Sequence, residues 1–259
     1  MLSALENIRS WHSSHTTDMV WQSAARTHMG SVRKMNEDAI FSNESDGLWA
    51  VADGMGGHEA GEVASQMIVH ALGNIQNSQR LSQYVENVDL ELMAVNKRIQ
   101  QHSEMIMESR ILGSAIVVLI IRGMVGVCLW AGDSRVYRIR EGQLERLTRD
   151  HSRVEELINS GLISPEEARS HPESNIITRA VGAGEELFLD HCTFLISPGD
   201  NYLLCSDGLY NCLTDPEIIE QIQKQDVDQS VQGLIDRALA KVANDNVSAI
   251  VVRNKTMAT

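Results

Sequence analysis

Residues 48 to 65 read LWAVADGMGGHEAGEVAS, and the rest of the chain is organised around this stretch. Its apolar start, residues 48–52, has the length and composition of a buried strand, and the apolar spacing over 59–77 predicts an amphipathic helix. Asp53, three glycines and His58 lie between the two. A strand-end aspartate beside a glycine carbonyl suits a hard cation, which binds oxygen. For this motif taken alone, an ordinary Asp-Gly turn is the alternative.

Composition narrows the class of protein. The chain has 259 residues, 43% of them hydrophobic and 22% charged, as in a soluble globular protein with one large or two small domains. Its 35 acidic and 22 basic residues give a formal charge of -13, which argues against a nucleic-acid partner. The apolar runs are too short to span a bilayer, and residues 1–18 form a polar lead-in without the features of a signal peptide. The four cysteines contain no CxxC pair and indicate buried thiols in a reducing compartment. We therefore expect a cytoplasmic protein with no membrane partner.

The order of the predicted elements indicates the fold class. Strand patterns occur in blocks, and the long helical patterns follow one another in pairs, which favours α+β with mostly antiparallel sheets. Residues 150–180 differ in character and predict two short helices in an inserted flap subdomain. Strands are expected at 19–26, 39–42, 48–52, 115–122, 125–131, 135–140, 144–147, 187–196, 201–206 and 247–253. Longer helices are expected at 59–77, 82–107, 215–224 and 227–243.

Aspartates recur at the ends of the predicted strands. Asp53, Asp133 and Asp207 each follow an apolar run and precede a small residue, and Asp245 stands before the last strand. Each is a turn signal alone, but strand ends of a sheet can converge on one cleft, so together they predict a shared site. Carboxylates without a histidine or cysteine cluster select magnesium or manganese. A carboxylate shared by two such cations is the usual centre of two-metal hydrolysis.

Two further side chains suit phosphate chemistry. Arg33 presents a planar fork of donors that binds phosphate oxygens, and Glu37 and Asp38 follow shortly after it. A solvated surface arginine is the alternative for Arg33. His58 suits a general acid that protonates a leaving alkoxide, and a core or helix-terminal histidine is the alternative.

Five motifs occur along the chain in this order: Arg33-x-x-Asn36-Glu37-Asp38, Val51-Ala52-Asp53-Gly54-Met55-Gly56-Gly57-His58, Gly132-Asp133-Ser134-Arg135, Ser206-Asp207-Gly208-Leu209 and Asp245-Asn246-x-Ser248. Together they resemble the motifs of the metal-dependent serine/threonine protein phosphatases, the protein phosphatase 2C class or PPM family. Residues 160–182 are similar to the flap of its bacterial single-domain members.

The resemblance implies a fold and an activity. The fold is a four-layer α-β-β-α sandwich of two mostly antiparallel sheets flanked by helix pairs, with residues 19–254 as the catalytic domain. The activity is hydrolysis of phosphoserine and phosphothreonine in proteins by a metal-bridging hydroxide, which reverses serine/threonine kinase signalling. Implied partners are phosphorylated proteins and a cognate serine/threonine kinase, and we expect a monomer.

The resemblance also assigns roles to individual residues. It implies two Mn²⁺ or Mg²⁺ ions, with a third in bacterial relatives. In the family pattern, Asp53 bridges both ions and Gly54 contributes its carbonyl oxygen. Asp207 and Asp245 match ligands of one ion, and Glu37 matches a ligand of the other. Asp38 matches a residue beside metal-bound water, and Asp133 matches a ligand of the third ion. Arg33 matches the phosphate-binding arginine, and His58 matches the proposed general acid.

Two other functions remain open at this point. A non-catalytic phosphoprotein-binding domain would be favoured if metal ligands were missing, and every implied ligand is present. A phosphatase acting on small phosphoesters is the alternative within hydrolases. The chain departs mildly from the family pattern at Gly113-Ser114-Ala115, where many relatives have Gly-Thr-Thr. This departure removes a hydroxyl near the site but no ligand.

Overall fold

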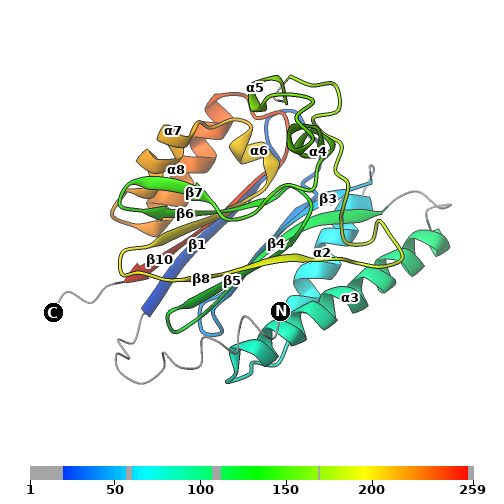
Figure 1. The fold of residues 1–259 in the computed structure, drawn as a ribbon, viewed down its shortest axis with the longest axis horizontal. Helices are drawn as coiled ribbons and strands as arrows, with labels where there is room; N and C mark the ends of the chain where they lie inside the picture. The colour runs from blue at the N-terminus through cyan, green and yellow to red at the C-terminus, as the bar shows by residue number, and fades with distance from the viewer. Residues whose placement is uncertain (1–19, 57–59, 107–111, 169, 256–259) are drawn as a thin grey trace.

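Two antiparallel sheets of five strands each pack face to face, and helices cover their outer faces (Figure 1). The computed structural model describes residues 20–56, 60–106, 112–168 and 170–255. Residues 1–18, the predicted polar lead-in, lie outside this part of the chain. Among the described residues, no helix combines the length and apolar character needed to cross a bilayer.

The first sheet, called sheet A, joins the two ends of the described chain. Its strand order is β1-β10-β9-β6-β7, and Val20 in β1 pairs with Lys255 in β10. β9 then pairs with β10 on one side and with β6 on the other. The strands of sheet A are β1 (Val20–His28), β10 (Val247–Lys255), β9 (Asn201–Cys205), β6 (Arg135–Arg140) and β7 (Gln143–Arg146).

The second sheet, sheet B, has the order β2-β3-β4-β5-β8. β4 lies at its centre and is apolar almost throughout, because both of its faces are buried. Ile116 and Val118 face the outer helices, whereas Val117 and Leu119 face sheet A. The strands of sheet B are β2 (Asp38–Asn43), β3 (Leu48–Met55), β4 (Gly113–Arg122), β5 (Val125–Ala131) and β8 (Asp190–Leu195).

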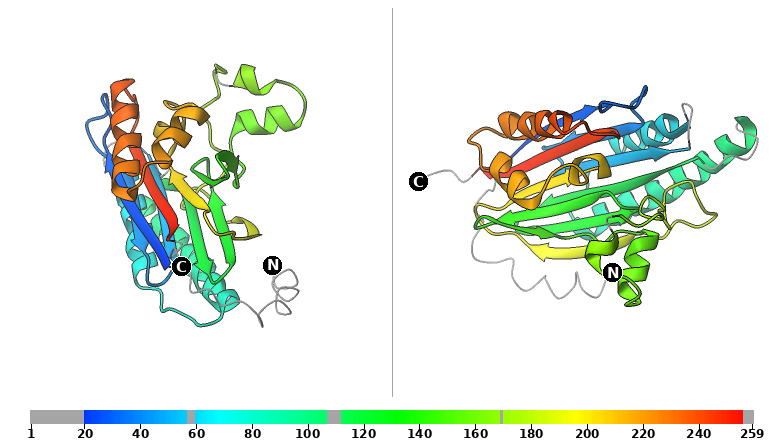
Figure 2. Two further views of the ribbon diagram at one scale, coloured as in Figure 1. Left: turned by 90° about the vertical axis from the view of Figure 1, so that its left-hand side faces the viewer. Right: turned by 90° about the horizontal axis from the view of Figure 1, so that it is seen from above.

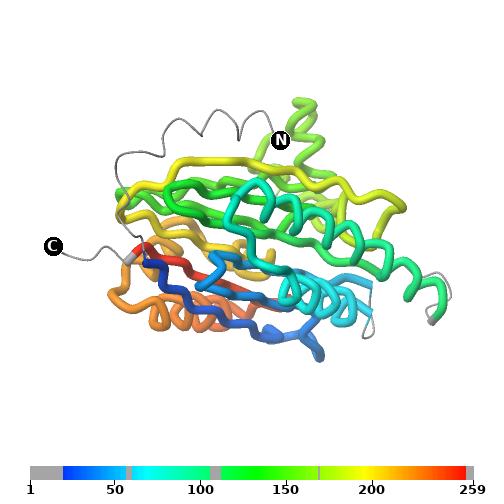
Figure 3. Tube along the Cα trace, turned by 90° about the horizontal axis from the view of Figure 1, so that it is seen from below, coloured from blue at the N-terminus to red at the C-terminus, as the bar shows by residue number. Residues whose placement is uncertain are grey.

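Helices form the two outer layers. Figure 3 shows α2 and α3 lying along sheet B, and Figure 1 shows α7 and α8 over sheet A. Three clusters of buried apolar side chains fill the spaces between helices and sheet B, between helices and sheet A, and between the sheets. The predicted four-layer sandwich is confirmed. The helices are α2 (Ala60–Gly73), α3 (Leu81–Ile106), α4 (Arg153–Asn159), α5 (Pro165–Ala168), α6 (Asp207–Tyr210), α7 (Asp215–Ile222) and α8 (Val227–Ala240).

One strand end differs from the expectation. The sequence places the end of β3 at Ala52 and a turn at Gly113, but β3 continues to Met55. Asp53 pairs with Ala115, and Met55 pairs with Gly113. The Asp-Gly motif does not end the strand because the start of β4 supplies hydrogen-bonding partners for it. Asp53 therefore lies on a regular strand, where its backbone is held on both sides by β2 and β4.

The predicted flap contains α4 and α5, which stand away from the sheets (Figure 2). α4 has no buried residue, and Ala168 is the buried residue of α5. A bridge between Ser152 and Ile177 closes the base of this segment, and Thr178 N donates to His151 O at 2.8 Å. The flap is thus joined to the sandwich through a narrow base next to the end of β5.

Candidate metal centre and phosphate site

Asp38 and Asp53 begin the candidate site as a cross-strand pair. Asp38 is the first residue of β2 and stands directly opposite Asp53 in β3. Side chains opposite each other in an antiparallel pair have Cβ atoms about 4.5–5.5 Å apart. Two carboxylates at that spacing repel each other when both are ionised, so a cation between them would be stabilising.

Asp38 is oriented by two hydroxyl groups from sheet A. Ser206 Oγ and Ser248 Oγ both donate to Asp38 Oδ2, at 2.8 and 2.6 Å. The other oxygen, Oδ1, is buried and has no hydrogen-bond partner. These contacts fix the carboxylate of a sheet B residue against sheet A and leave one oxygen free for a ligand.

Glu37 reaches the same region through a close contact between β3 and α2. A Cβ on Gly54 would lie 2.1 Å from Gly61 O and 2.5 Å from Glu37 O, so only glycine fits at this position. Gly54 N donates to Glu37 O at 3.2 Å. Glu37 Oε1 is buried without a hydrogen-bond partner. The absence of a side chain at Gly54 therefore brings a second unpaired carboxylate oxygen to the end of β3.

Asp207 and Asp245 flank strands of sheet A. Asp207 begins α6 and is separated from β9 by Ser206, and Asp245 lies just before β10. A Cβ on Gly208 would lie 2.0 Å from Asn246 O, so the two segments are in direct backbone contact. Asn246 N donates to Asp245 Oδ1 at 2.8 Å. The close approach of Gly208 to Asn246 therefore places Asp207 and Asp245 on neighbouring stretches of backbone.

Electrostatics shows that the aspartates act on one another. Burial raises the pKa of Asp53 well above its usual range, and the charges of Asp38, Asp207, Asp133 and Asp245 raise it further. Burial and then Asp133 and Asp245 likewise raise the pKa of Asp207. Burial raises the pKa of Asp38, and that of Asp133, to about 6. The structure thus brings carboxylates from both sheets within electrostatic range of one another.

The chemistry of this donor set fits divalent cations. Two buried carboxylate oxygens, on Glu37 and Asp38, have no hydrogen-bond partner, and the surrounding negative charge is unbalanced. All the donors are oxygens, which Mg²⁺ and Mn²⁺ prefer. Among the described residues, no three acidic, histidine or cysteine side chains already stand in coordination geometry.

Arg33 lies at the exposed rim of the cluster. Its Nη2 is 2.7 Å from Asp245 Oδ2, and half of the Arg33 side chain is accessible to solvent. The hydrogen bond with Asp245 raises the pKa of Arg33. The guanidinium group therefore lies beside one of the carboxylates and is open to solvent. His58, the candidate general acid, lies outside the described residues.

Sequence reasoning assigned no role to three side chains that organise the site. Asn246 Oδ1 accepts from Glu37 N at 2.8 Å, and its Nδ2 donates to Met29 O and Met35 O at 3.0 and 2.9 Å. It thereby fixes both ends of the loop that carries Arg33. The other two side chains are those of Ser206 and Ser248, which donate hydrogen bonds to Asp38. Asn246, Ser206 and Ser248 all belong to the motifs quoted above, and nothing else in the sequence indicates their roles in the site.

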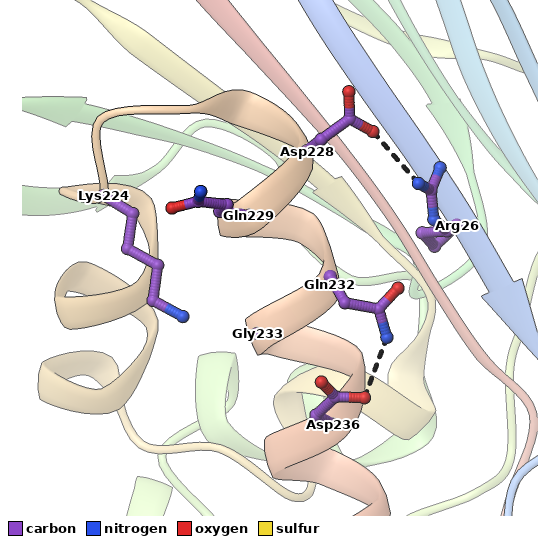
Figure 4. Close-up of a pocket in the computed structure, with 7 residues that line it drawn as sticks. All are labelled: Arg26, Lys224, Asp228, Gln229, Gln232, Gly233 and Asp236. Atoms are coloured by element: carbon purple, nitrogen blue, oxygen red, sulfur yellow. Dashed lines mark hydrogen bonds and ion pairs between the residues drawn. The ribbon is translucent and has the colours of Figure 1, made fainter.

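A separate shallow groove lies on the far side of sheet A from sheet B. It runs between β1 and α8, and Figure 4 shows the ion pair of Arg26 with Asp228 at its edge. Lys224, Gln229 and the surface of α8 complete its lining. None of the candidate metal-site residues lines this groove, so it does not belong to the carboxylate cluster.

Comparison with known proteins identifies the same family through a sequence model and through curated relatives. The sequence model of the family "Protein phosphatase 2C" matches residues 27–248. The serine/threonine protein phosphatase PstP of Mycobacterium tuberculosis is 37% identical over 233 residues, which are 90% of this chain and 45% of PstP. The chain thus spans less than half the length of that curated relative.

Solved structures show the same fold. PppA, described as a key regulatory component of T6SS in Pseudomonas aeruginosa, is 42% identical with a TM-score of 0.84, over 91% of this chain and 98% of PppA. The catalytic domain of PstP in complex with two manganese ions is 35% identical with a TM-score of 0.82, over 91% of this chain and 98% of that domain.

Proposed function

The chain belongs to the protein phosphatase 2C family, and from this we propose that it hydrolyses phosphoserine and phosphothreonine in proteins with the help of Mn²⁺ or Mg²⁺. One observation carries the proposal. Carboxylates from β2, β3, α6 and the segment before β10 lie within electrostatic range of one another, beside a half-exposed arginine. Two carboxylate oxygens of this cluster, on Asp38 and on Glu37 just before β2, are buried without hydrogen-bond partners. A relative of the same fold holds two manganese ions.

The roles of the acidic residues follow from their positions. Asp53 would lie between two ions, with the carbonyl of Gly54 beside it, and Asp207 and Asp245 would complete one ion site from sheet A. Glu37 and Asp38 would complete the other side, and Asp133 would hold a third ion. When bound, such ions lower the pKa of a water nucleophile and neutralise the charge on phosphate. The two serine hydroxyls on Asp38 would hold its free oxygen toward that water.

Two other residues would handle the phosphate itself. Arg33 would donate two parallel hydrogen bonds to phosphoryl oxygens, because a guanidinium group binds phosphate bidentately. His58 would protonate the departing seryl or threonyl oxygen, a role assigned from its motif. The reaction then needs no phosphoenzyme, since water is the nucleophile.

Location, partners and boundaries are part of the proposal. We propose a cytoplasmic monomer, with residues 19–254 as the catalytic domain, that opposes a cognate serine/threonine kinase. The cysteines fit a reducing compartment, because they contain no CxxC pair and Cys128 and Cys205 are buried thiols.

A comparison of three substrates tests the activity. The protein is assayed with Mn²⁺ on a phosphothreonine peptide, the matching phosphotyrosine peptide and a small aryl phosphate. We expect rapid release of phosphate from the phosphothreonine peptide, slow release from the phosphotyrosine peptide, and loss of all activity in excess chelator. Preference for the aryl phosphate would indicate a small-phosphoester phosphatase. Binding of the phosphothreonine peptide without hydrolysis would indicate a non-catalytic domain.

A further inference from the structure

Tyr210 connects two segments that carry candidate metal ligands. It is the last residue of α6, a single turn whose first residue is Asp207. Its hydroxyl group donates to the backbone carbonyl of Asp133, at 3.1 Å. One side chain therefore spans from the Asp207 turn to the Asp133 turn, which follows β5 in the other sheet.

Arg135 holds the ring of Tyr210 in place. Its guanidinium carbon lies 3.5 Å from the centroid of the Tyr210 ring, a stacked cation–π contact. The same group donates through Nε and Nη2 to Asp150, at 3.0 and 2.6 Å, and through Nη1 to Tyr137 Oη, at 2.9 Å. A guanidinium group with partners on three sides has little freedom to move. Because Asp150 balances its charge, Arg135 adds little net positive charge beside a cation site.

The residue before Asp133 is held by hydrogen bonds to His151, which precedes the flap helices. Gly132 N donates to His151 Nδ1 at 3.2 Å, and His151 N donates to Gly132 O at 2.9 Å. Gly132 has a φ of 113°, which side-chain-bearing residues rarely adopt. His151 thus fixes the backbone before Asp133, and the Tyr210 hydroxyl fixes the carbonyl that follows. Without that hydroxyl, the peptide after Asp133 could rotate and carry the carboxylate with it.

We propose that Tyr210 is a positioning residue whose hydroxyl, on a ring held by Arg135, fixes the position of Asp133 relative to Asp207 so that Asp133 can bind its divalent cation. This inference rests on the proposed function, because it assigns Asp133 and Asp207 to metal binding. Tyr210 is assigned no contact with substrate or ion in this proposal and would act through Asp133. Groups that orient metal ligands in this way typically affect metal affinity or activity by about 10- to 100-fold.

The substitution Tyr210→Phe tests the role, since it removes the hydroxyl and keeps the stacked ring. Mn²⁺ binding is measured by isothermal titration calorimetry, and phosphothreonine-peptide hydrolysis is measured as a function of Mn²⁺. We expect the weakest Mn²⁺ site to lose about tenfold in affinity. The Mn²⁺ concentration for half-maximal activity should rise equally, while the KM for the peptide changes less than about twofold. In an Asp133→Ala background, Tyr210→Phe should have no further effect on Mn²⁺ binding.

Tyr137→Phe is the matched control, because it removes a hydroxyl that touches the same arginine but not Asp133. It should bind Mn²⁺ as the unmodified protein does, and thermal unfolding checks that both variants are folded. Unchanged Mn²⁺ binding in Tyr210→Phe, or equal weakening in both variants, would overturn the positioning role alone. If the unmodified protein neither binds Mn²⁺ nor hydrolyses the peptide, both the proposed function and this inference are wrong.

Discussion

The ion pair of Arg33 with Asp245 joins the candidate phosphate-binding residue to a candidate metal ligand. The two side chains are 2.7 Å apart at the rim of the site, and Arg33 is half exposed. An arginine in this position can bind a phosphoryl group only if its guanidinium group breaks the ion pair with Asp245 or uses its remaining donors. A cation on Asp245 would favour that change, because it would take over the charge that Arg33 now balances.

Replacement of Arg33 by alanine should therefore weaken phosphosubstrate binding. Hydrogen bonds between charged groups contribute about 1.5–3 kcal/mol, so we expect the KM for a phosphothreonine peptide to rise about 10- to 100-fold. The turnover number should fall less, because in its proposed role Arg33 would bind phosphate already before the transition state. Steady-state kinetics at saturating Mn²⁺ measures both quantities. Lys34→Ala, next to it in the same loop, is the control and should change KM less than about twofold. A fall in turnover without a rise in KM would contradict the assignment.

The residue scale also shows what sequence could supply. The carboxylates were found because aspartates at successive strand ends form a pattern, whereas Asn246, Ser206 and Ser248 carry no such pattern. Small polar residues near turns have many uses, such as caps and Asx turns, so their type alone does not reveal a function. Only the folded chain brings Ser206 and Ser248 to the same oxygen of Asp38, across 168 and 210 residues of sequence respectively.

At the scale of single elements, apolar periodicity predicted most strands and both long helices. β4 was found because its two buried faces make an almost unbroken apolar run. The end of β3 was missed because Asp53 and Gly54 have the composition of a turn, and their pairing with the start of β4 depends on residues about 60 positions away. α6 was also missed, since a single helical turn has no measurable periodicity.

Asp200, just before β9, connects that strand to β6, and we expect it to affect the stability of the fold at acid pH. Arg140 donates to both of its oxygens at 2.7 Å, and Ser197 N and Tyr202 Oη donate to Oδ2. Burial acts to raise the pKa of Asp200, but these donors hold it below its usual range. A depressed pKa means that the folded protein favours the ionised form. The stabilisation is present above the unfolded pKa of about 3.9 and is lost as pH falls through the folded value.

Asp200→Asn should lower the free energy of unfolding at pH 7 by about 1–3 kcal/mol, because it removes the charged partner of Arg140, whose side chain is partly exposed. The difference from the unmodified protein should shrink as pH falls below about 4, where Asp200 takes up a proton in the unfolded chain first and in the folded protein only at lower pH. Urea unfolding across pH 3–7 measures this change. Asp228→Asn breaks the exposed ion pair with Arg26 and should cost less than about 1 kcal/mol. Equal losses in the two variants, or a loss from Asp200→Asn that does not vary with pH, would show the interpretation to be wrong.

The flap is the element expected to set substrate preference. α4 and α5 bury little surface, and the segment is closed at its base by the Ser152–Ile177 bridge. Segments with few buried contacts often shape access to a site without taking part in its chemistry.

Replacement of residues 155–174 by a short glycine-serine linker keeps that bridge and removes both helices. We expect the relative rates on different phosphopeptides to change by about tenfold, while aryl-phosphate hydrolysis is largely retained. The measurement is kcat/KM on a panel of phosphopeptides, with the thermal unfolding midpoint as a check on folding. An unchanged peptide ranking, or equal loss on peptides and aryl phosphate, would contradict a role in selectivity.

At the scale of the whole molecule, the candidate metal centre forms where the two sheets meet. Asp38 and Asp53 belong to sheet B, whereas Asp207 and Asp245 flank strands of sheet A. The layered architecture followed from the resemblance and from the blocks of strands. The strand order could not be predicted from local pattern, since β1 pairs with β10 across almost the full described chain. Convergence of the carboxylates depends on that pairing, and local sequence carries no information about it.

A cation bound between the sheets should stabilise the folded protein, and the free carboxylates should destabilise it. Both effects act on Asp53, because burial and four neighbouring carboxylates all raise its pKa. Asp53→Asn removes a buried carboxyl group whose ionised form is disfavoured by this environment, and it keeps the shape of the side chain. In chelator, we expect the variant to be more stable than the unmodified protein by about 0.5–2 kcal/mol. The same variant should lose phosphatase activity.

Addition of Mn²⁺ should reverse that order. A ligand at 100 times its Kd stabilises the folded state by about 2.7 kcal/mol, so the unmodified protein should gain about this much and Asp53→Asn much less. Urea unfolding in chelator and in Mn²⁺ gives the four values required. Glu186→Gln, at an exposed site away from the cluster, should change stability less than about 0.5 kcal/mol and keep the full gain from Mn²⁺. If Asp53→Asn is less stable than the unmodified protein in chelator, the carboxylates are not held together against their repulsion. If it keeps the full gain from Mn²⁺, Asp53 does not bind the cation.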